Sequence, residues 1–204
     1  MKIVVFGGTG SVGQLIVNKL AAQGLKVLVL TRQAKEPGNN IEYVAGDVLD
    51  EKIVEQCIEP GDGVVVALGF NNSAFDTMSK GTANIIAAMK NKGASHIICL
   101  SSHGVAESWM YLPETFREYV KHNEILTHAF NDHGIQEEMV RNSGLDWTIV
   151  RPTEIVDIPE KSTFTVNARG QDPKYHISKH DVAQFIADEI MSPKHLKEIC
   201  TITD

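Results

Sequence analysis

The chain has 204 residues, 43% of them apolar, and a formal net charge of −7. This length suffices for one sizeable hydrophobic core but is short for two independent domains, so we expect a single domain spanning residues 1–204. An acidic chain without clusters of Lys and Arg is not expected to bind nucleic acid or a membrane surface, because both require neutralisation of phosphate charge.

Three cysteines, Cys57, Cys99 and Cys200, form no metal-ligand or redox spacing and no disulfide framework. We interpret them as small buried apolar residues in a reducing compartment, and we expect no metal site. The first apolar run is not preceded by a charged leader or a cleavage site, and it is too short to span a membrane. A cytoplasmic enzyme or binding protein is therefore expected.

Short apolar runs alternate with helix-length amphipathic segments along the chain. The runs cover residues 3–6, 27–30, 41–44, 64–68, 96–100 and 147–150; helices are expected at 12–23, 50–58 and 76–92 and in a stretch ending at 143–144. Gly24, Gly93 and Gly144 follow three of these helices as expected left-handed caps. This order is typical of parallel βαβ units. We predict an α/β fold: a Rossmann-like, doubly wound parallel sheet in a three-layer αβα domain.

A glycine-rich loop follows the first apolar run. Gly7, Gly10 and Gly13 fit a Gly-x-x-Gly-x-x-Gly spacing between a strand and a helix, where backbone amides can approach a pyrophosphate. A structural turn is the alternative, but the position at the start of the βαβ series favours a dinucleotide site. The expected contacts of the loop are made by Gly7, Thr9, Gly10, Ser11 and Val12.

The end of the second strand indicates which dinucleotide is bound. Arg32 stands where an NAD-selective fold usually places Asp or Glu, and a guanidinium can pair with a 2′-phosphate. We predict NADP rather than NAD, with help from Lys35; the alternative is a solvated Arg at a strand end. Further cofactor contacts are expected from the ends of the third, fourth, fifth and sixth strands: Asp47 and Val48, Ala67, Leu68 and Gly69, Ser101, and Pro152 and Thr153.

Tyr175 and Lys179 have the spacing of a dehydrogenase acid/base pair. Ser178 and Asp181, however, fit a capping-box start for the helix that follows, so Tyr175 is expected before that helix and the pair is interpreted as structural. Alcohol dehydrogenation through a Tyr acid is therefore not expected. Residues 152–175, rich in Thr, Pro and Asp, are expected to form a substrate flap.

Over nearly its full length the chain resembles an atypical short-chain dehydrogenase/reductase of the NAD(P)-binding, NmrA-like group, and within it the biliverdin-IXβ reductase/flavin reductase branch. The resemblance rests on the stretches FGGTGSVG, GDVLD, MSKGTANIIAAMKNKG, DHGIQEEMVRNSGLDWTIVRP and ISKHDVAQF. That branch implies NADPH as cofactor and hydride delivery to a flavin or a related planar substrate that is not tightly bound.

The resemblance also implies site residues. The family's Ser after the fifth strand corresponds to Ser102 and its helix His to His133, both expected to be catalytic. For each there is a structural alternative: a turn-stabilising hydrogen bond for Ser102 and a surface or structural role for His133. Close relatives carry a His after the Pro that follows the sixth strand, where this chain has Glu154, and an Arg after the Leu-Gly of the fourth strand, where this chain has Phe70. Both differences argue against biliverdin as the particular substrate.

The pocket for the substrate is expected beside the fifth and sixth strands. His103, Glu154 and an aromatic loop with Trp109 and Met110 are the expected lining, although loop aromatics can equally form local core. We therefore predict an NADPH-dependent reductase of flavins (FMN, FAD or riboflavin), quinones or linear tetrapyrroles that acts as a monomer. The alternative is a non-catalytic NADP-binding redox sensor; a sugar-nucleotide epimerase would need the Tyr–Lys pair and a larger C-terminal domain.

Overall fold

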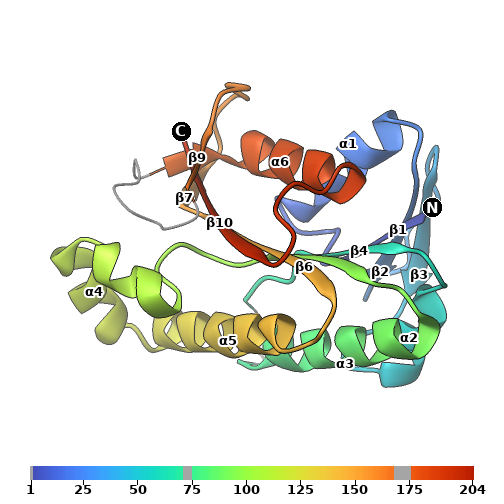
Figure 1. Ribbon diagram of the computed structural model, residues 1–204, viewed down its shortest axis with the longest axis horizontal. Helices are drawn as coiled ribbons and strands as arrows, with labels where there is room; N and C mark the ends of the chain where they lie inside the picture. Colours follow the sequence, from blue (N-terminus) through green and yellow to red (C-terminus); the bar gives the residue numbers. More distant parts are fainter. Residues whose placement is uncertain (1, 71–74, 168–175) are drawn as a thin grey trace.

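The computed structural model describes residues 2–70, 75–167 and 176–204, and its centre is an eight-stranded sheet (Figure 1). The strands lie in the order β3-β2-β1-β4-β5-β6-β10-β8. Their bounds are β1 Lys2–Phe6, β2 Lys26–Thr31, β3 Ile41–Ala45, β4 Gly63–Val66, β5 His96–Leu100, β6 Asp146–Pro152, β8 Thr165–Asn167 and β10 Glu198–Thr203. The paired strands run parallel except β8, which is antiparallel to β10.

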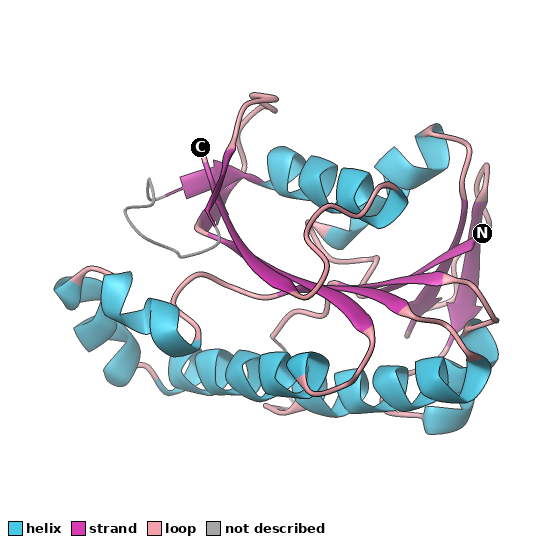
Figure 2. Ribbon diagram, in the orientation of Figure 1, coloured by secondary structure: helices cyan, strands magenta, loops and turns pink. Residues whose placement is uncertain are grey.

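Helices cover both faces of this sheet (Figure 2). One face carries α1 (Gly13–Ala22) and α6 (Lys179–Met191), and the other carries α2 (Glu51–Cys57), α3 (Thr77–Lys92) and α5 (Glu124–Arg141) (Figure 1). An apolar core lies on each face of the sheet. On the side of α1 and α6, Val5 and Ile98 belong to one cluster with Leu20 and Ile186. On the opposite side, Val66 belongs to a second cluster, which also contains residues of α2 and α3. The predicted three-layer Rossmann-like fold is confirmed.

The order of the strands reverses at β1. Its neighbours are β2 on one side and β4 on the other, and the connecting helices α1 and α3 lie on opposite faces of the sheet. In doubly wound sheets such a reversal opens a crevice at the carboxyl ends of the strands, where ligands bind. The glycine loop follows β1, so it lies at this crevice.

Local sequence signals account for several helix ends. The Asp50 carboxylate caps α2 by accepting from the amides of Lys52 and Ile53, and the Ser178 hydroxyl caps α6 by accepting from the amide of His180. Gly93 ends α3 with φ +76°, a conformation that glycine adopts without steric cost. The predicted helix starts at residues 50 and 178 are therefore confirmed.

Several elements were not expected from the sequence. These are β10, the strands β7 (Glu154–Val156) and β9 (His176–Ser178), which pair with each other, the edge strand β8, the 3₁₀ helix η1 (Ala106–Tyr111) and α4 (Glu114–Lys121). The described part of the predicted flap, residues 152–167, contains β7 and β8; residues 168–175 lie outside the described chain. No helix among the described residues is long and apolar enough to cross a bilayer.

Candidate active site

The glycine loop needs glycine for two reasons that the geometry makes explicit. Gly7 has φ +85°, and a Cβ on it would lie 2.2 Å from the carbonyl oxygen of Ala67 at the end of β4. A Cβ on Gly13 would lie 2.2 Å from the carbonyl oxygen of Gly7. A Cβ on Gly10 would meet only that same oxygen, at 3.4 Å, so this part of the loop remains open to a ligand.

The amino end of α1 faces the same space. Its N-cap residue, Val12, makes no side-chain cap hydrogen bond, and no acidic residue lies in the described first turn. The positive end of the helix dipole is therefore not neutralised by the helix's own side chains. An open glycine loop and an uncapped helix start fit a pyrophosphate, which accepts hydrogen bonds from backbone amides.

Arg32 lies beside this loop, directly after β2. Together with Thr9, Thr31, Gln33 and Lys35 it lines a small hollow of about 320 Å³. Arg32 makes no ion pair with a carboxylate of the described residues, so its guanidinium is free to bind an anion. Two cationic side chains and no carboxylate in one hollow form a favourable environment for a phosphate group.

The hollow adjoins a cavity of about 1050 Å³ at the carboxyl ends of β1, β2, β4, β5 and β6. The cavity is lined by nearly all the residues predicted for the site: Gly7, Thr9, Gly10, Ser11, Val12, Arg32, Asp47, Val48, Ala67, Leu68, Gly69, Ser101, Ser102, His103, His133, Pro152, Thr153 and Glu154. The structure thus brings together, at one edge of the sheet, residues that are up to 147 positions apart in the sequence (from residue 7 to residue 154).

Asp47 and Val48 follow β3 on the cofactor side of the cavity. One Asp47 oxygen accepts from the amide of Leu49 at 2.9 Å, so this carboxylate also stabilises the turn that leads into α2. Val48 is buried against α3, where a Cβ on Gly81 would lie 2.8 Å from it. The close packing of α3 therefore fixes this wall.

Ser101 and Ser102 end β5, and their hydroxyls have different partners. The Ser101 hydroxyl donates to Glu137 of α5 at 2.6 Å and is buried, so it contributes to the floor of the cavity. The Ser102 hydroxyl donates to the carbonyl oxygen of His103 at 3.1 Å and is half-buried. Ser102 thus makes the turn-stabilising bond and also lines the cavity.

Beneath Ser101 lies a buried ion-pair network that sequence reasoning missed. The guanidinium of Arg151, whose side chain is 2% exposed, binds both oxygens of Glu137, with Nε to Oε1 at 2.8 Å, and its Nη1 donates to Glu107 of η1 at 2.7 Å. Burial opposes the charge, but the hydrogen bonds that Arg151 donates to Glu137 and Glu107 raise its pKa above the usual value. One signal was present: an Arg inside the otherwise apolar run of β6 requires a buried partner.

His103 is a buried imidazole that faces the cavity. It is 7% exposed, and neither ring nitrogen has a hydrogen-bond partner among the described residues. Burial, followed by the nearby charge of Arg151, lowers the pKa of His103 below its ordinary value. A neutral ring with unpaired nitrogens is suited to hydrogen bonding with a ligand, because such bonds would relieve the cost of burying them.

His133 lies on α5 and is half-buried in the cavity wall. Its Nδ1 lies 3.1 Å from Oε1 of Gln136, and the amide nitrogen of Gln136 donates to Thr82 at 2.9 Å. With the amide oriented in this way, Nδ1 carries the proton and Nε2 is left as an acceptor. Burial lowers the pKa of His133, against the opposing effect of the bond to Gln136, so the neutral ring is favoured.

The far end of the cavity is apolar and aromatic. It is formed by the end of η1 and the segment after it, by α4 and by α5, through Tyr111, Leu112, Pro113, Phe116 and Phe130. Trp109 and Met110, which the sequence suggested for this wall, are not among the lining residues. The Trp109 ring packs edge-on against Phe130 at 5.7 Å, and Met110 is 66% exposed. The aromatic segment is therefore at the expected place, but neighbouring residues face the space.

The segment after β6 closes the cavity. The carbonyl oxygen of Pro152 accepts from the amide of His103 at 2.9 Å, and the amide of Thr153 donates to Ile202 at 3.1 Å. These two backbone groups are thus engaged within the protein, while both residues and Glu154 line the cavity.

Of the pair Tyr175 and Lys179, only Lys179 lies among the residues that the structure describes. Lys179 is the first residue of α6 and pairs with Asp157 at 2.7 Å. Its contacts agree with the structural interpretation of this lysine as part of a helix start.

Comparison with known proteins agrees with this geometry. A model of the NAD(P)H-binding family matches residues 7–193. The divinyl chlorophyllide a 8-vinyl-reductase of Cucumis sativus is 26% identical over 98% of the chain, and the chain spans about half (52%) of the length of that relative. A solved anaerobillin reductase from Escherichia coli O157:H7 superimposes with a TM-score of 0.82 at 19% identity, covering 100% of this chain and 97% of that one.

A short-chain dehydrogenase/reductase from Veillonella parvula, solved in complex with NADP, superimposes with a TM-score of 0.80 at 19% identity over 100% of this chain and 94% of that one. The chain belongs to the NAD(P)H-binding family, whose model matches most of its length. The fold implied by the resemblance to the atypical short-chain dehydrogenases/reductases is confirmed, and the family match agrees with the predicted binding of an NAD(P)H cofactor.

Proposed function

We propose that this protein is an NADPH-dependent reductase that transfers hydride to a flavin or to a similar planar acceptor, such as a quinone or a linear tetrapyrrole. The observation that carries the proposal is a single cavity that extends from the glycine loop, past the end of β5, to the aromatic wall on α4 and α5. A dinucleotide and a flat ring system fit together in such a space, which is apolar with few polar groups.

The hollow beside Arg32 supports NADPH over NADH. Arg32 and Lys35 would bind the 2′-phosphate as a pair of cations, and the amides of the glycine loop and of α1 would hold the pyrophosphate. The NADP complex of the Veillonella parvula protein, which has the same fold, agrees with this assignment.

When bound, the nicotinamide supplies the hydride, so the chain has to position two ring systems and exclude water. The rings of Phe116 and Phe130 would flank the acceptor, and Ser102 would orient it or the carboxamide. His133, with Nδ1 held by Gln136, would relay from solvent the proton that balances the hydride. The names of the cucumber and Escherichia coli reductases, a chlorophyllide and an anaerobillin reductase, support an extended planar acceptor.

Turnover tests the proposal directly. Purified protein is mixed with NADPH and, in separate samples, FMN, riboflavin, a quinone or biliverdin, and oxidation is followed at the nicotinamide absorbance band. We expect acceptor-dependent oxidation of NADPH that is slowed by Phe130→Ala. Tight NADP binding without turnover of any acceptor would contradict the proposal of a reductase and would favour the alternative, a non-catalytic NADP-binding redox sensor.

The cofactor preference has its own test in Arg32→Ala. A charge-assisted hydrogen bond contributes about 1.5–3 kcal/mol, so we expect kcat/KM for NADPH to fall by roughly ten- to a hundredfold while kcat/KM for NADH changes little. Gln33→Ala, which removes a neutral side chain from the same hollow, is the matched control. An unchanged ratio of NADPH to NADH in Arg32→Ala would refute the role of this residue.

A further inference from the structure

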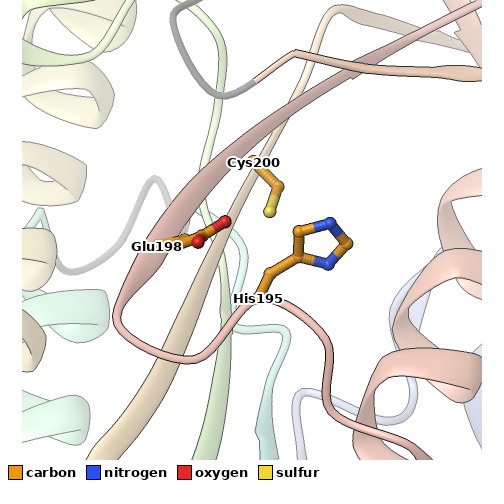
Figure 3. A group of neighbouring side chains, drawn as sticks. All are labelled: His195, Glu198 and Cys200. Carbon is orange, nitrogen blue, oxygen red and sulfur yellow. The ribbon is translucent and has the colours of Figure 1, made fainter.

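A second group of potential ligands lies away from the cofactor cavity, near the start of β10. His195, Glu198 and Cys200 each offer one ligand atom, and these three atoms lie within 4.8 Å of one another. Figure 3 shows the imidazole, the carboxylate and the thiol converging on one point. The group lies toward the amino ends of β6 and β10, whereas the cavity lies at the carboxyl ends of the strands.

The fold, rather than a familiar motif, brings these side chains together. Glu198 and Cys200 are two residues apart on β10 and therefore project from the same face. His195 precedes the strand, and its carbonyl oxygen accepts from the Thr148 hydroxyl of β6 at 2.9 Å and from the amide of Glu198 at 3.3 Å. Lys197, with φ +60°, provides the turn between them. The loop thus holds the imidazole over the strand.

A buried carboxylate orients the imidazole. Glu189 of α6 is 3% exposed; one of its oxygens accepts from the amides of Lys194 and His195, and the other lies 2.9 Å from Nδ1 of His195. When Nδ1–H of His195 donates to this carboxylate, the lone pair of Nε2 is left free for a cation, as in metal sites where a carboxylate supports a ligating histidine.

Cys200 and Glu198 complete the set with complementary properties. Cys200 is fully buried and contributes a thiol, with its S–H proton, to the same group of side chains. A bound cation would replace that proton, as it does at other thiolate sites. Glu198 is exposed, so an ion can enter from solvent on that side and keep a water ligand.

We propose that Nε2 of His195, a carboxylate oxygen of Glu198 and Sγ of Cys200 bind one zinc-class divalent cation, with water as the fourth ligand. A mixed set of imidazole, thiolate and carboxylate selects zinc or cobalt over magnesium or calcium, which require oxygen ligands. The ion would fix the loop between α6 and β10 to the sheet, so its role is to stabilise the fold and not to take part in hydride transfer.

Cobalt provides the test, because a cobalt–thiolate bond gives a charge-transfer band that other ligands do not. Protein freed of metal with a chelator is titrated with Co²⁺ and then with Zn²⁺, which displaces it. We expect one ion per chain, a thiolate band, and a higher midpoint of thermal unfolding with zinc. Cys200→Ser should abolish the band, whereas Cys57→Ser, which alters a buried thiol on α2, should retain it.

Two further variants keep the proposal open to refutation if Cys200→Ser does not fold. Glu198→Gln changes an exposed ligand, and Glu189→Gln changes the group behind His195; each should weaken zinc binding, the latter by about 10–100-fold. Absence of the thiolate band in the wild type, its survival in Cys200→Ser, or unchanged zinc affinity in Glu198→Gln would overturn the site. None of these measurements uses the cofactor or an acceptor, so the result is independent of the proposed function.

Discussion

At the scale of single residues, Arg151 links two parts of the candidate site. Its guanidinium is buried between Glu137 of α5 and Glu107 of η1, and Glu137 also holds Ser101 at the end of β5. A buried charge depends on its partners, because it has lost the water that would otherwise solvate it. The floor of the cavity and the segment leading to the aromatic wall are therefore joined through one cation.

Glu137→Gln tests this dependence. Removing the buried negative charge leaves Arg151 without its closest counter-ion, so we expect the free energy of unfolding, measured in urea, to fall by about 3 kcal/mol. Glu107→Gln should cost less than about 1 kcal/mol, because Glu107 is 60% exposed and water can replace it. Glu138→Gln, an exposed neighbour on α5, is the control; equal losses for residues 107 and 137 would contradict the argument.

At the scale of elements, α3 shows how a helix end can depend on distant sequence. The sequence predicts a start at Asp76, yet Asp76 makes no side-chain cap bond. Instead, the buried carboxylate of Asp132 on α5 accepts from the amides of Met78 and Ser79, at 2.9 and 3.1 Å. These residues are more than fifty positions apart, so a local pattern cannot reveal the cap. The two hydrogen bonds to Asp132 also fix α5, and with it His133, against α3.

Asp132→Ala should therefore destabilise the fold more than loss of a local cap. We expect about 2 kcal/mol for Asp132→Ala, the upper end for a lost cap, since the freed amides are buried. Asp50→Ala, which removes the exposed cap of α2, should cost about 1 kcal/mol. Urea unfolding measures both, and a smaller loss for Asp132→Ala than for Asp50→Ala would show that the bonds between α5 and α3 contribute little.

Over the whole molecule, sequence patterns predict what is local or repeated. The Val-rich runs, the glycine loop and caps such as Asp50 and Gly93 predicted the parallel sheet, its helices and the edge where the cavity lies. β10, Glu198–Thr203, escaped prediction because it is short and half of its residues are polar, and because its partner β6 lies about fifty residues earlier. The aromatic wall and the Arg151 network also escaped, because which side of α5 faces β5 is decided by tertiary packing.

Three partly or fully buried histidines make the stability of the fold depend on pH. His96, His103 and His133 have lowered pKa values, in each case with burial as the largest cause. In the unfolded chain a histidine titrates near 6.5, so below that pH the unfolded state binds more protons than the folded state, and stability falls as the pH decreases. Glu107 and Glu189 also have lowered pKa values, but their contribution is lost only as the pH falls through the ordinary range of Glu, near 4.3, and below it.

We therefore expect the free energy of unfolding in urea to decrease from pH 7.5 to pH 5.5, by up to about 1.4 kcal/mol for each unit by which a pKa is lowered. His103→Gln should reduce this dependence, because its side chain no longer takes up a proton on unfolding. Cys99→Ala is the control: burial raises the pKa of that thiol, so its removal changes stability without changing the slope. A stability that is flat or rises toward pH 5.5 would mean that the folded protein accepts these protons, with cavity water or a rearranged partner solvating the imidazolium of His103.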